Sequence, residues 1–199
     1  MKVAIIKYNA GNIMSVDYAL QRLGISAVIT DDFDEIASAD KVIFPGVGEA
    51  STTMLYLREK KMDILISCLR QPVLGICLGL QLMCKYSEEG NTTCLGIFSE
   101  EVKKFTVNDT EQNRVKVPHM GWNKVYDLKT PLFSGDLGNS YTYFVHSYYA
   151  ALGPETIASC SYGTAFSAAL HRDNFYATQF HPEKSGKPGH RILENFIAL

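Results

Sequence analysis

Short hydrophobic runs alternate with amphipathic segments along the first half of the chain. Val3 to Ile6, Val42 to Phe44 and Val73 to Ile76 are apolar runs of strand length. Between them, apolar residues recur at helical spacing from Ile13 to Leu23, and Gly24 follows as the expected C-terminal cap. Further elements predicted in this half are a strand at Ala27 to Ile29 and helices near Thr52–Lys60 and Asp63–Leu69. Such alternation predicts a mostly parallel sheet with helices on both faces.

The pattern changes at about Glu101. From there the predicted strands are short and rich in aromatic residues, as in Tyr141 to Val145 and Ala165 to Leu170, and indicate a mixed or antiparallel addition to the sheet. A last helix is predicted from Gly189 to Ala198. Because no segment resembles a linker or a repeat, we expect one α/β domain over residues 1–199, with three layers.

Composition and charge narrow the functional classes. The chain of 199 residues is 46% hydrophobic and 20% charged, and its net charge of −2 implies no bulk attraction to nucleic acid or to a membrane. The five cysteines are odd in number and lack Cys-x-x-Cys spacing, which argues against a disulfide framework and a zinc site. No signal peptide and no apolar run of spanning length is recognised, so a cytoplasmic location is expected.

A cysteine flanked by glycines follows the strand that ends at Ile76. In Gly75-Ile76-Cys77-Leu78-Gly79 a glycine lies two residues to either side of the cysteine, the pattern of a nucleophile elbow. Leu78 to Tyr86 is predicted to be a helix, so the Cys77 sulfur would lie at a helix N-terminus, where the positive potential favours the thiolate. A buried structural cysteine in a glycine-rich turn is the alternative interpretation.

A histidine that can serve as the base lies near the C-terminus. Phe175 to Phe180 is predicted to be a strand, with His181 at its end and Glu183 two residues later. Glu183 can bind one imidazole nitrogen while the other faces a thiol, as in a catalytic triad of nucleophile, base and orienting acid. The alternative is an incidental His and Glu in a surface turn; the presence of Cys77 favours the triad.

A glycine-rich loop follows the predicted strand at Lys41 to Phe44. Pro45-Gly46-Val47-Gly48 can turn backbone N–H groups toward a ligand, so the N–H groups of Val47 and Leu78 are predicted to form an oxyanion hole. The same pattern also occurs in ordinary tight turns. Nucleotide binding is rejected because neither Gly-x-Gly-x-x-Gly nor Gly-Lys-Ser follows.

Segments along nearly the whole chain resemble the class I, triad-type glutamine amidotransferases, and among them the glutaminase subunits of imidazole glycerol phosphate synthase. The cysteine elbow and His181-Pro182-Glu183 are shared by the whole superfamily. Pro118 to Asn123 (Pro-His-Met-Gly-Trp-Asn) and Lys184-Ser185 are narrower and separate this family from other triad amidotransferases. Further matching segments are Gly11 to Val16, Glu88 to Gly90 and Tyr143 to Tyr149.

The resemblance implies the class I amidotransferase fold and hydrolysis of glutamine without a metal or cofactor. It implies Cys77 as nucleophile, His181 as acid and base, and Glu183 as the residue that orients His181. It also implies that the amino-acid end of glutamine is held by Gly48, Gln81, Glu89, Ser147 and Tyr148. Glu89 suits an α-ammonium group, whereas an α-carboxylate needs donors such as Gln81 or backbone N–H groups. Alone, Gln81 and Glu89 would be interpreted as solvated surface residues.

A separate polypeptide has to accept the ammonia, because the glutaminase machinery occupies this whole chain. The resemblance implies a heterodimer with a (β/α)₈-barrel cyclase of histidine biosynthesis. Candidates for the contact face or the ammonia gate are Asn12, Trp122, Tyr143 and Lys184, although a single tryptophan more often packs in a core. Lys7-Tyr8-Asn9 departs from the Asp-Tyr-Gly usual in relatives, which puts the charge pairing near this face in doubt.

Two other functions compete with this interpretation. A stand-alone cysteine hydrolase or peptidase on the same sheet would turn over an ester or a peptide without a partner. A binding subunit with a relic triad would show no thiol reactivity. His119 and His146 are predicted to be structural in any of these cases.

Overall fold

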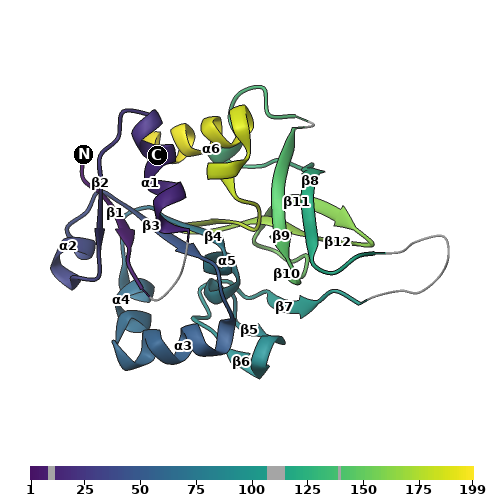
Figure 1. The fold of residues 1–199 in the computed structure, drawn as a ribbon, viewed down its shortest axis with the longest axis horizontal. Coiled ribbons are helices and arrows are strands. Elements are labelled where there is room, and N and C mark those ends of the chain that lie inside the picture. Colours follow the sequence, from purple (N-terminus) through teal and green to yellow (C-terminus); the bar gives the residue numbers. More distant parts are fainter. Residues whose placement is uncertain (9–11, 107–114, 139) are drawn as a thin grey trace.

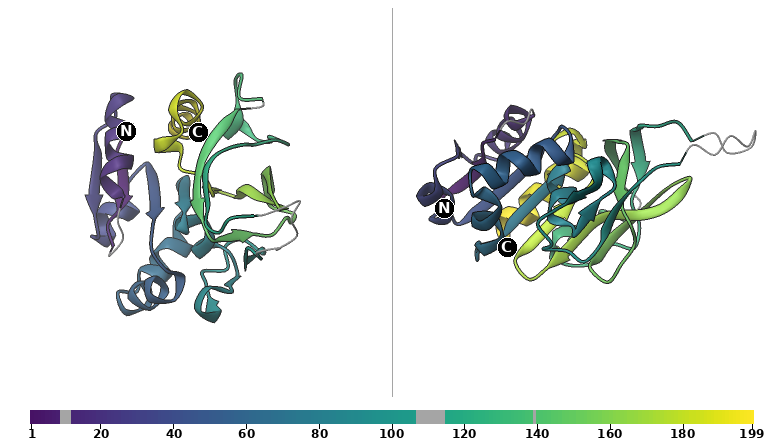
Figure 2. Two further views of the ribbon diagram at one scale, coloured as in Figure 1. Left: turned by 45° about the vertical axis from the view of Figure 1, so that its right-hand side comes forward. Right: turned by 90° about the horizontal axis from the view of Figure 1, so that it is seen from below.

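The computed structural model of the protein describes residues 1–8, 12–106, 115–138 and 140–199 (Figure 1). Asn9 and Gly11, which belong to two of the segments discussed above, lie outside these residues. Figure 2 shows that the first half of the chain, in purple to blue, and the strands of the second half, in green, occupy opposite sides of the molecule.

A seven-stranded sheet forms the centre of the fold, in the order β11-β12-β13-β4-β3-β1-β2. Five neighbouring strands are parallel, and the two at one edge, β12 and β11, are antiparallel. The parallel strands are β1 (Val3–Ile6), β2 (Ala27–Thr30), β3 (Lys41–Gly46), β4 (Val73–Cys77) and β13 (Phe175–Thr178), and the antiparallel ones are β12 (Thr164–Arg172) and β11 (Thr156–Tyr162). The predicted mostly parallel sheet with antiparallel additions in the second half is therefore confirmed.

Helices cover both faces of this sheet. One core lies between the sheet and α2 (Phe33–Ala37), α3 (Ala50–Glu59), α4 (Met62–Cys68) and α5 (Leu78–Met83). The other lies under α1 (Ile13–Arg22) and α6 (Gly186–Ala198). In β1, Ala4 and Ile6 pack into the first core and Val3 and Ile5 into the second, as the two-residue period of a strand requires. The layered α/β architecture follows from strands that are apolar on both faces.

Two smaller sheets are built mostly from the second half. One has the order β10-β7-β5-β6, with β5 (Tyr86–Ser87), β6 (Thr92–Thr93), β7 (Glu101–Lys104) and β10 (Tyr148–Ala150). The other pairs β8 (His119–Lys124) with β9 (Tyr141–His146). In β8, His119 is buried whereas its neighbour Met120 is exposed, so this ribbon has one inner and one outer face.

Two predicted helices have different bounds in the structure, and one further helix was not predicted. The helix expected over Leu78 to Tyr86 ends at Met83, because the N–H of Lys85 pairs with the carbonyl of Glu100 and the chain enters β5. The C-terminal helix begins at Gly186 and not at the expected Gly189. A proline is tolerated in its first turn, because the backbone N–H groups of a first turn have no acceptor within the helix. Helix α2 was not expected, although Asp32 caps it by accepting from the N–H of Glu35.

Within the described residues, every helix is too short or too polar to cross a bilayer. The predicted cap of α1 is confirmed, because Gly24 has φ +75° and its N–H donates to the carbonyl of Gln21.

The end of β3 and the start of α5 approach each other backbone to backbone. A Cβ on Gly79 would overlap the carbonyl oxygen of Phe44, and a Cβ on Gly46 would lie 2.8 Å from the nitrogen of Gly79. Glycine is therefore required at both positions by space rather than by dihedral angles.

We expect Gly79→Ala to destabilise the protein by about 1–3 kcal/mol, because the added methyl group has to displace backbone atoms. Gly138→Ala is the matched control, since a Cβ at Gly138 has open space around it. Urea unfolding of the two variants measures the difference. Equal unfolding midpoints for both variants would show that the approach of β3 and α5 is not tight.

Candidate active site

The nucleophile candidate lies in a strained turn between β4 and α5. Cys77 has φ 55° and ψ −106°, a backbone conformation that non-glycine residues rarely adopt. Its side chain points out of the end of β4, and the residue is 7% exposed. A Cβ on Gly75 would lie 2.9 Å from the sulfur of Met83, so the helix packs directly onto the strand that precedes the turn. The predicted strand-to-helix elbow is present.

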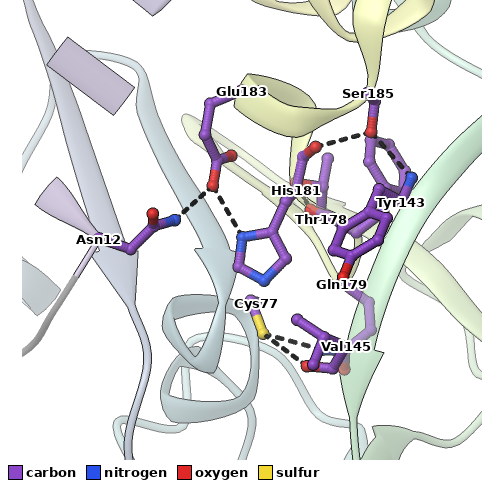
Figure 3. Close-up of polar contacts among 10 residues, drawn as sticks. Asn12, Cys77, Tyr143, Val145, Thr178, Gln179, His181, Glu183 and Ser185 are labelled. Atoms are coloured by element: carbon purple, nitrogen blue, oxygen red, sulfur yellow. Dashed lines mark hydrogen bonds and ion pairs between the residues drawn. The ribbon is translucent and has the colours of Figure 1, made fainter. Parts of the chain in front are cut away.

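His181 and Glu183 lie beside Cys77, as Figure 3 shows. The Nδ1 atom of His181 lies 2.8 Å from Oε1 of Glu183, and the two side chains are 1% and 0% exposed. Asn12 donates from Nδ2 to the same carboxylate oxygen at 2.5 Å. Figure 3 shows the imidazole edge opposite Glu183 turned toward the Cys77 sulfur. Sequence positions 77, 181 and 183 are thus brought together in the order that proton transfer requires.

The charge state of His181 is set by its neighbours. Burial disfavours the imidazolium, but the charges of Cys77 and Glu183 and their hydrogen bonds outweigh burial and raise the pKa of His181 to about 10. The Nε2 atom of His181 is buried and, among the described residues, lacks a hydrogen bond of standard geometry. Among the groups around the ring, the charge of Cys77 contributes most to the raised pKa of His181.

Two groups contact the Cys77 sulfur besides the imidazole. The carbonyl of Val145 lies 3.9 Å away and can accept from a thiol, and Nε2 of Gln179 donates to the sulfur at 3.7 Å (Figure 3). Gln179 was not predicted to be a site residue. Its position two residues before His181 could have identified it, because residues i and i+2 of an extended segment share a face.

A cavity of about 320 Å³ opens at the sulfur. It is lined by both predicted oxyanion residues, by all five predicted glutamine-binding residues and by others: Val47, Gly48, Cys77, Leu78, Gln81, Glu89, Pro118, Val145, His146, Ser147 and Tyr148. A larger cleft of about 610 Å³ lies between α1 and α6 and includes Glu183 and Lys184. Cys77 lines the smaller cavity and does not line this cleft, so the smaller cavity is the candidate active site.

Gln81 and Glu89 both present acceptor oxygens in the cavity lining. Both N–H bonds of the Gln81 amide are used, one by the carbonyl of Tyr148 at 2.9 Å and one by Oε1 of Gln179 at 3.0 Å. Gln81 thus offers a ligand only its carbonyl oxygen, and the donor that we expected for a carboxylate is occupied. Glu89 is partly buried; burial raises its pKa, and its Oε2 accepts from the N–H of Ala50 at 2.8 Å.

The four predicted contact residues lie in two settings. Trp122 is 56% exposed and Lys184 is exposed, so the interpretation of Trp122 as a core residue is wrong. Tyr143 is partly buried and packs edge-on against Trp122 with 6.0 Å between ring centroids. Asn12 is turned inward to Glu183. That these four residues contact a partner subunit or form an ammonia gate stays a prediction.

His119 and His146 form a buried pair beside the cavity. His119 Nδ1 lies 3.0 Å from His146 Nε2, and His119 is stacked between the rings of Phe144 and Tyr162. Burial lowers the pKa of His119 to about 4 and that of His146 to about 3. Both rings are therefore neutral at physiological pH.

Comparisons with known proteins show the family of the chain. The family model described as "Glutamine amidotransferase class-I" matches residues 5–199. The chain is 63% identical, over the full length of both proteins, to the imidazole glycerol phosphate synthase subunit HisH of Bacteroides fragilis strain YCH46. It is 47% identical to the subunit of the same name in Pasteurella multocida, over 98% of this chain and 96% of that protein.

Solved structures share the fold at lower identity. A GMP synthase component from Thermoplasma acidophilum has a TM-score of 0.75 at 23% identity, over 100% of this chain and 92% of the other. PurLQS from Thermotoga maritima has a TM-score of 0.70 at 12% identity, over 99% of this chain and 97% of the other. At these identities the likeness concerns the fold alone.

Because His119 and His146 are neutral in the folded protein, we expect the free energy of unfolding to fall in mild acid. The folded-state pKa values of His119 and His146 lie below the value of about 6.5 in an unfolded chain. The unfolded state therefore binds more protons, and the contribution of the pair to stability is present above pH 6.5 and is lost as the pH falls toward 4 and 3. Urea unfolding between pH 7.5 and 4.5 should show this decline, with a slope of up to about 1.4 kcal/mol per pH unit for each group.

The matched control for this pH dependence is His119→Phe, which removes one of the two titrating rings. Its decline in stability should be shallower than that of the unsubstituted protein. Parallel declines would show that the pair does not control the acid transition.

Proposed function

Because the chain belongs to the class I glutamine amidotransferase family, we propose that it is the glutaminase subunit of an imidazole glycerol phosphate synthase. In this role it hydrolyses the side-chain amide of glutamine to glutamate and ammonia. The observation that supports the proposal most directly is the contact of a carboxylate-bound imidazole with a cysteine at the floor of a cavity. Full-length identity of 63% to a subunit of that name narrows the amidotransferase class to this synthase.

The proposed reaction begins with attack of the Cys77 sulfur on the amide carbon of glutamine. The N–H groups of Val47 and Leu78 hold the oxyanion that develops, an interaction typically worth about 10²–10³ in kcat for each donor. The imidazolium of His181 donates its Nε2 proton to the departing nitrogen, so ammonia leaves as a neutral molecule and a thioester remains. The raised pKa of His181 keeps this proton available at neutral pH.

Water completes the cycle. Neutral His181 takes a proton from water while the hydroxide that forms attacks the thioester, and the sulfur leaves as a thiolate. Glutamate is released, and the thiolate again faces an imidazolium. Glu183 and Asn12 keep the ring in one orientation through both steps.

We also propose the ends at which glutamine is held. The carboxylate of Glu89 receives the α-ammonium group together with the carbonyl oxygen of Gln81, because both are acceptors. The α-carboxylate is then left to the backbone N–H groups of Ser147 and Tyr148 and to the Gly48 loop.

The ammonia goes to a partner subunit. Similar proteins are named as subunits of a synthase, which implies such a partner. We propose a (β/α)₈-barrel cyclase that uses the ammonia to form imidazole glycerol phosphate and AICAR in histidine biosynthesis. The proposed contact face contains the exposed Trp122 and Lys184 and the partly buried Asn12 and Tyr143.

Cys77→Ala should abolish release of glutamate from glutamine, because the variant lacks the nucleophile. The measurement is glutamate formed by the full chain with and without the cyclase subunit. Binding to that subunit should be retained, and Cys68→Ala, which changes an exposed cysteine outside the cavity lining, should leave the rate unchanged. Glutamate release by Cys77→Ala at the unsubstituted rate would refute the proposal.

Glu89→Gln should raise the KM for glutamine about tenfold or more while kcat changes little, since the lost charge pairs with the substrate rather than with the transition state. Glu88→Gln, at the neighbouring exposed carboxylate, is the matched control. An unchanged KM for Glu89→Gln would place the α-ammonium group elsewhere.

A further inference from the structure

A chain of buried polar groups leads from the β8–β9 ribbon to the Cys77 sulfur. It contains His119 and His146, which the proposed mechanism does not use. The contact between the two rings has no fixed direction by itself, but groups with fixed donor or acceptor roles lie at both ends of the chain and determine it.

The outer end of this chain is the amide of Asn123. Its Oδ1 accepts from the N–H of Lys124 at 2.8 Å, and its Nδ2 donates to the carbonyl of Ser161 at 3.0 Å. These two contacts fix which atom of the amide is nitrogen. The same Nδ2 lies 3.3 Å from Nε2 of His119, so this ring nitrogen has to be the acceptor and the proton of His119 is on Nδ1.

The inner end of the chain is the carbonyl of Tyr148. It lies 2.7 Å from Nδ1 of His146, and a carbonyl can only accept, so His146 also has its proton on Nδ1. The Nε2 atom of His146 is then an acceptor, and it faces the Nδ1–H of His119 at 3.0 Å. The contacts of Asn123 and of the Tyr148 carbonyl therefore lead independently to the same result, a proton on Nδ1 of both histidines.

The chain continues past Tyr148 to the nucleophile. The Tyr148 carbonyl also accepts from Gln81 at 2.9 Å, which uses its second lone pair. Gln81 donates its other N–H to Gln179 at 3.0 Å, and Gln179 donates to the Cys77 sulfur at 3.7 Å. One carbonyl oxygen thus joins the histidine pair to the two amides that lie against the reacting atom.

We propose that His119 and His146, as neutral Nδ1–H tautomers, are positioning residues that fix the Tyr148 peptide and the Gln81 and Gln179 amides for the binding of glutamine. This inference rests on the proposed glutaminase function. His119 lies behind the cavity and does not line it, so it acts only through His146.

Aromatic packing keeps the pair in one orientation. The His119 ring lies 4.0 Å from the ring centroid of Tyr162 at an interplanar angle of 19°, and 4.9 Å from that of Phe144. Phe166 packs edge-on against His146 at 5.3 Å. An added proton on either ring would set two N–H groups against each other, because every acceptor in the chain is already used.

The tautomers are measured directly by long-range ¹⁵N–¹H NMR correlation of the full chain labelled at histidine. At pH 7.5, the signals of His119 and His146 should both show a protonated Nδ1 and an unprotonated Nε2. Isolated neutral imidazoles favour Nε2–H, so this result is not the default. An Nε2–H tautomer or a charged ring at either position would overturn the proposal, and this measurement needs no variant.

The functional consequence is tested with His119→Phe. Loss of the donor leaves Nε2 of His146 unsatisfied and allows the Tyr148 peptide to turn, so the KM for glutamine should rise about tenfold while kcat changes less than about threefold. His119→Asn, which keeps a side-chain N–H near the position of Nδ1, should restore most of the KM. The assays use the full chain together with its synthase partner.

Phe196→Leu is the packing control, because Phe196 is fully buried in the same hydrophobic core but belongs to α6 and not to the aromatic cluster around the two histidines. It should lower the melting temperature as His119→Phe does, but it should leave KM unchanged. Equal KM values for His119→Phe and the unsubstituted protein would show that the pair only stabilises the fold. If the unsubstituted protein with its partner releases no glutamate, the proposed function fails instead, and the tautomer measurement still stands.

Discussion

The close approach of the end of β3 to the start of α5 is the constraint on which the site depends. Glycines at 46 and 79 allow two backbones to touch, and the chain turns from β4 into α5 at Cys77, which has a positive φ. A strained residue of this kind costs about 1–3 kcal/mol, which the two packed cores on either side of the sheet offset. The sulfur and the Val47 loop are thereby held at the same edge of the sheet.

The charges of the site are balanced without exposure to bulk water. Glu183 is buried, and it is compensated by the imidazole of His181 and by the amide of Asn12. A buried carboxylate is stable in a medium of low dielectric only when it has such partners. Here the two partners come from well-separated parts of the chain.

Much of the fold could be predicted from hydrophobic period. The β1, β3 and β4 strands are apolar on both faces and lie at the predicted positions, because burial of both faces leaves little choice of residue. The end of α5 could not be predicted, since Lys85 leaves the helix to pair with a segment 15 residues later. Local propensity contains no information about such a partner.

The site residues that could be predicted are likewise those that a local sequence pattern marks. Cys77, His181 and Glu183 could be chosen because each residue type has one obvious role in a triad and each occurs in a recognisable local pattern. Gln179 and the link between His119 and His146 were missed because their function depends on contacts across 102 and 27 positions of sequence. Asn123, at the outer end of the histidine chain, has no pattern in the sequence that marks it as a donor to a ring nitrogen.

The contact between Asn12 and Glu183 spans 171 positions of the sequence and joins the first helix to the segment that precedes the last one. During synthesis on the ribosome, the cysteine elbow can therefore form long before its base and orienting acid have left the exit tunnel. A partly made chain holds a thiol with no imidazole beside it. Glutamine consumption thus begins only after the segment that contains His181 and Glu183 has folded against the elbow.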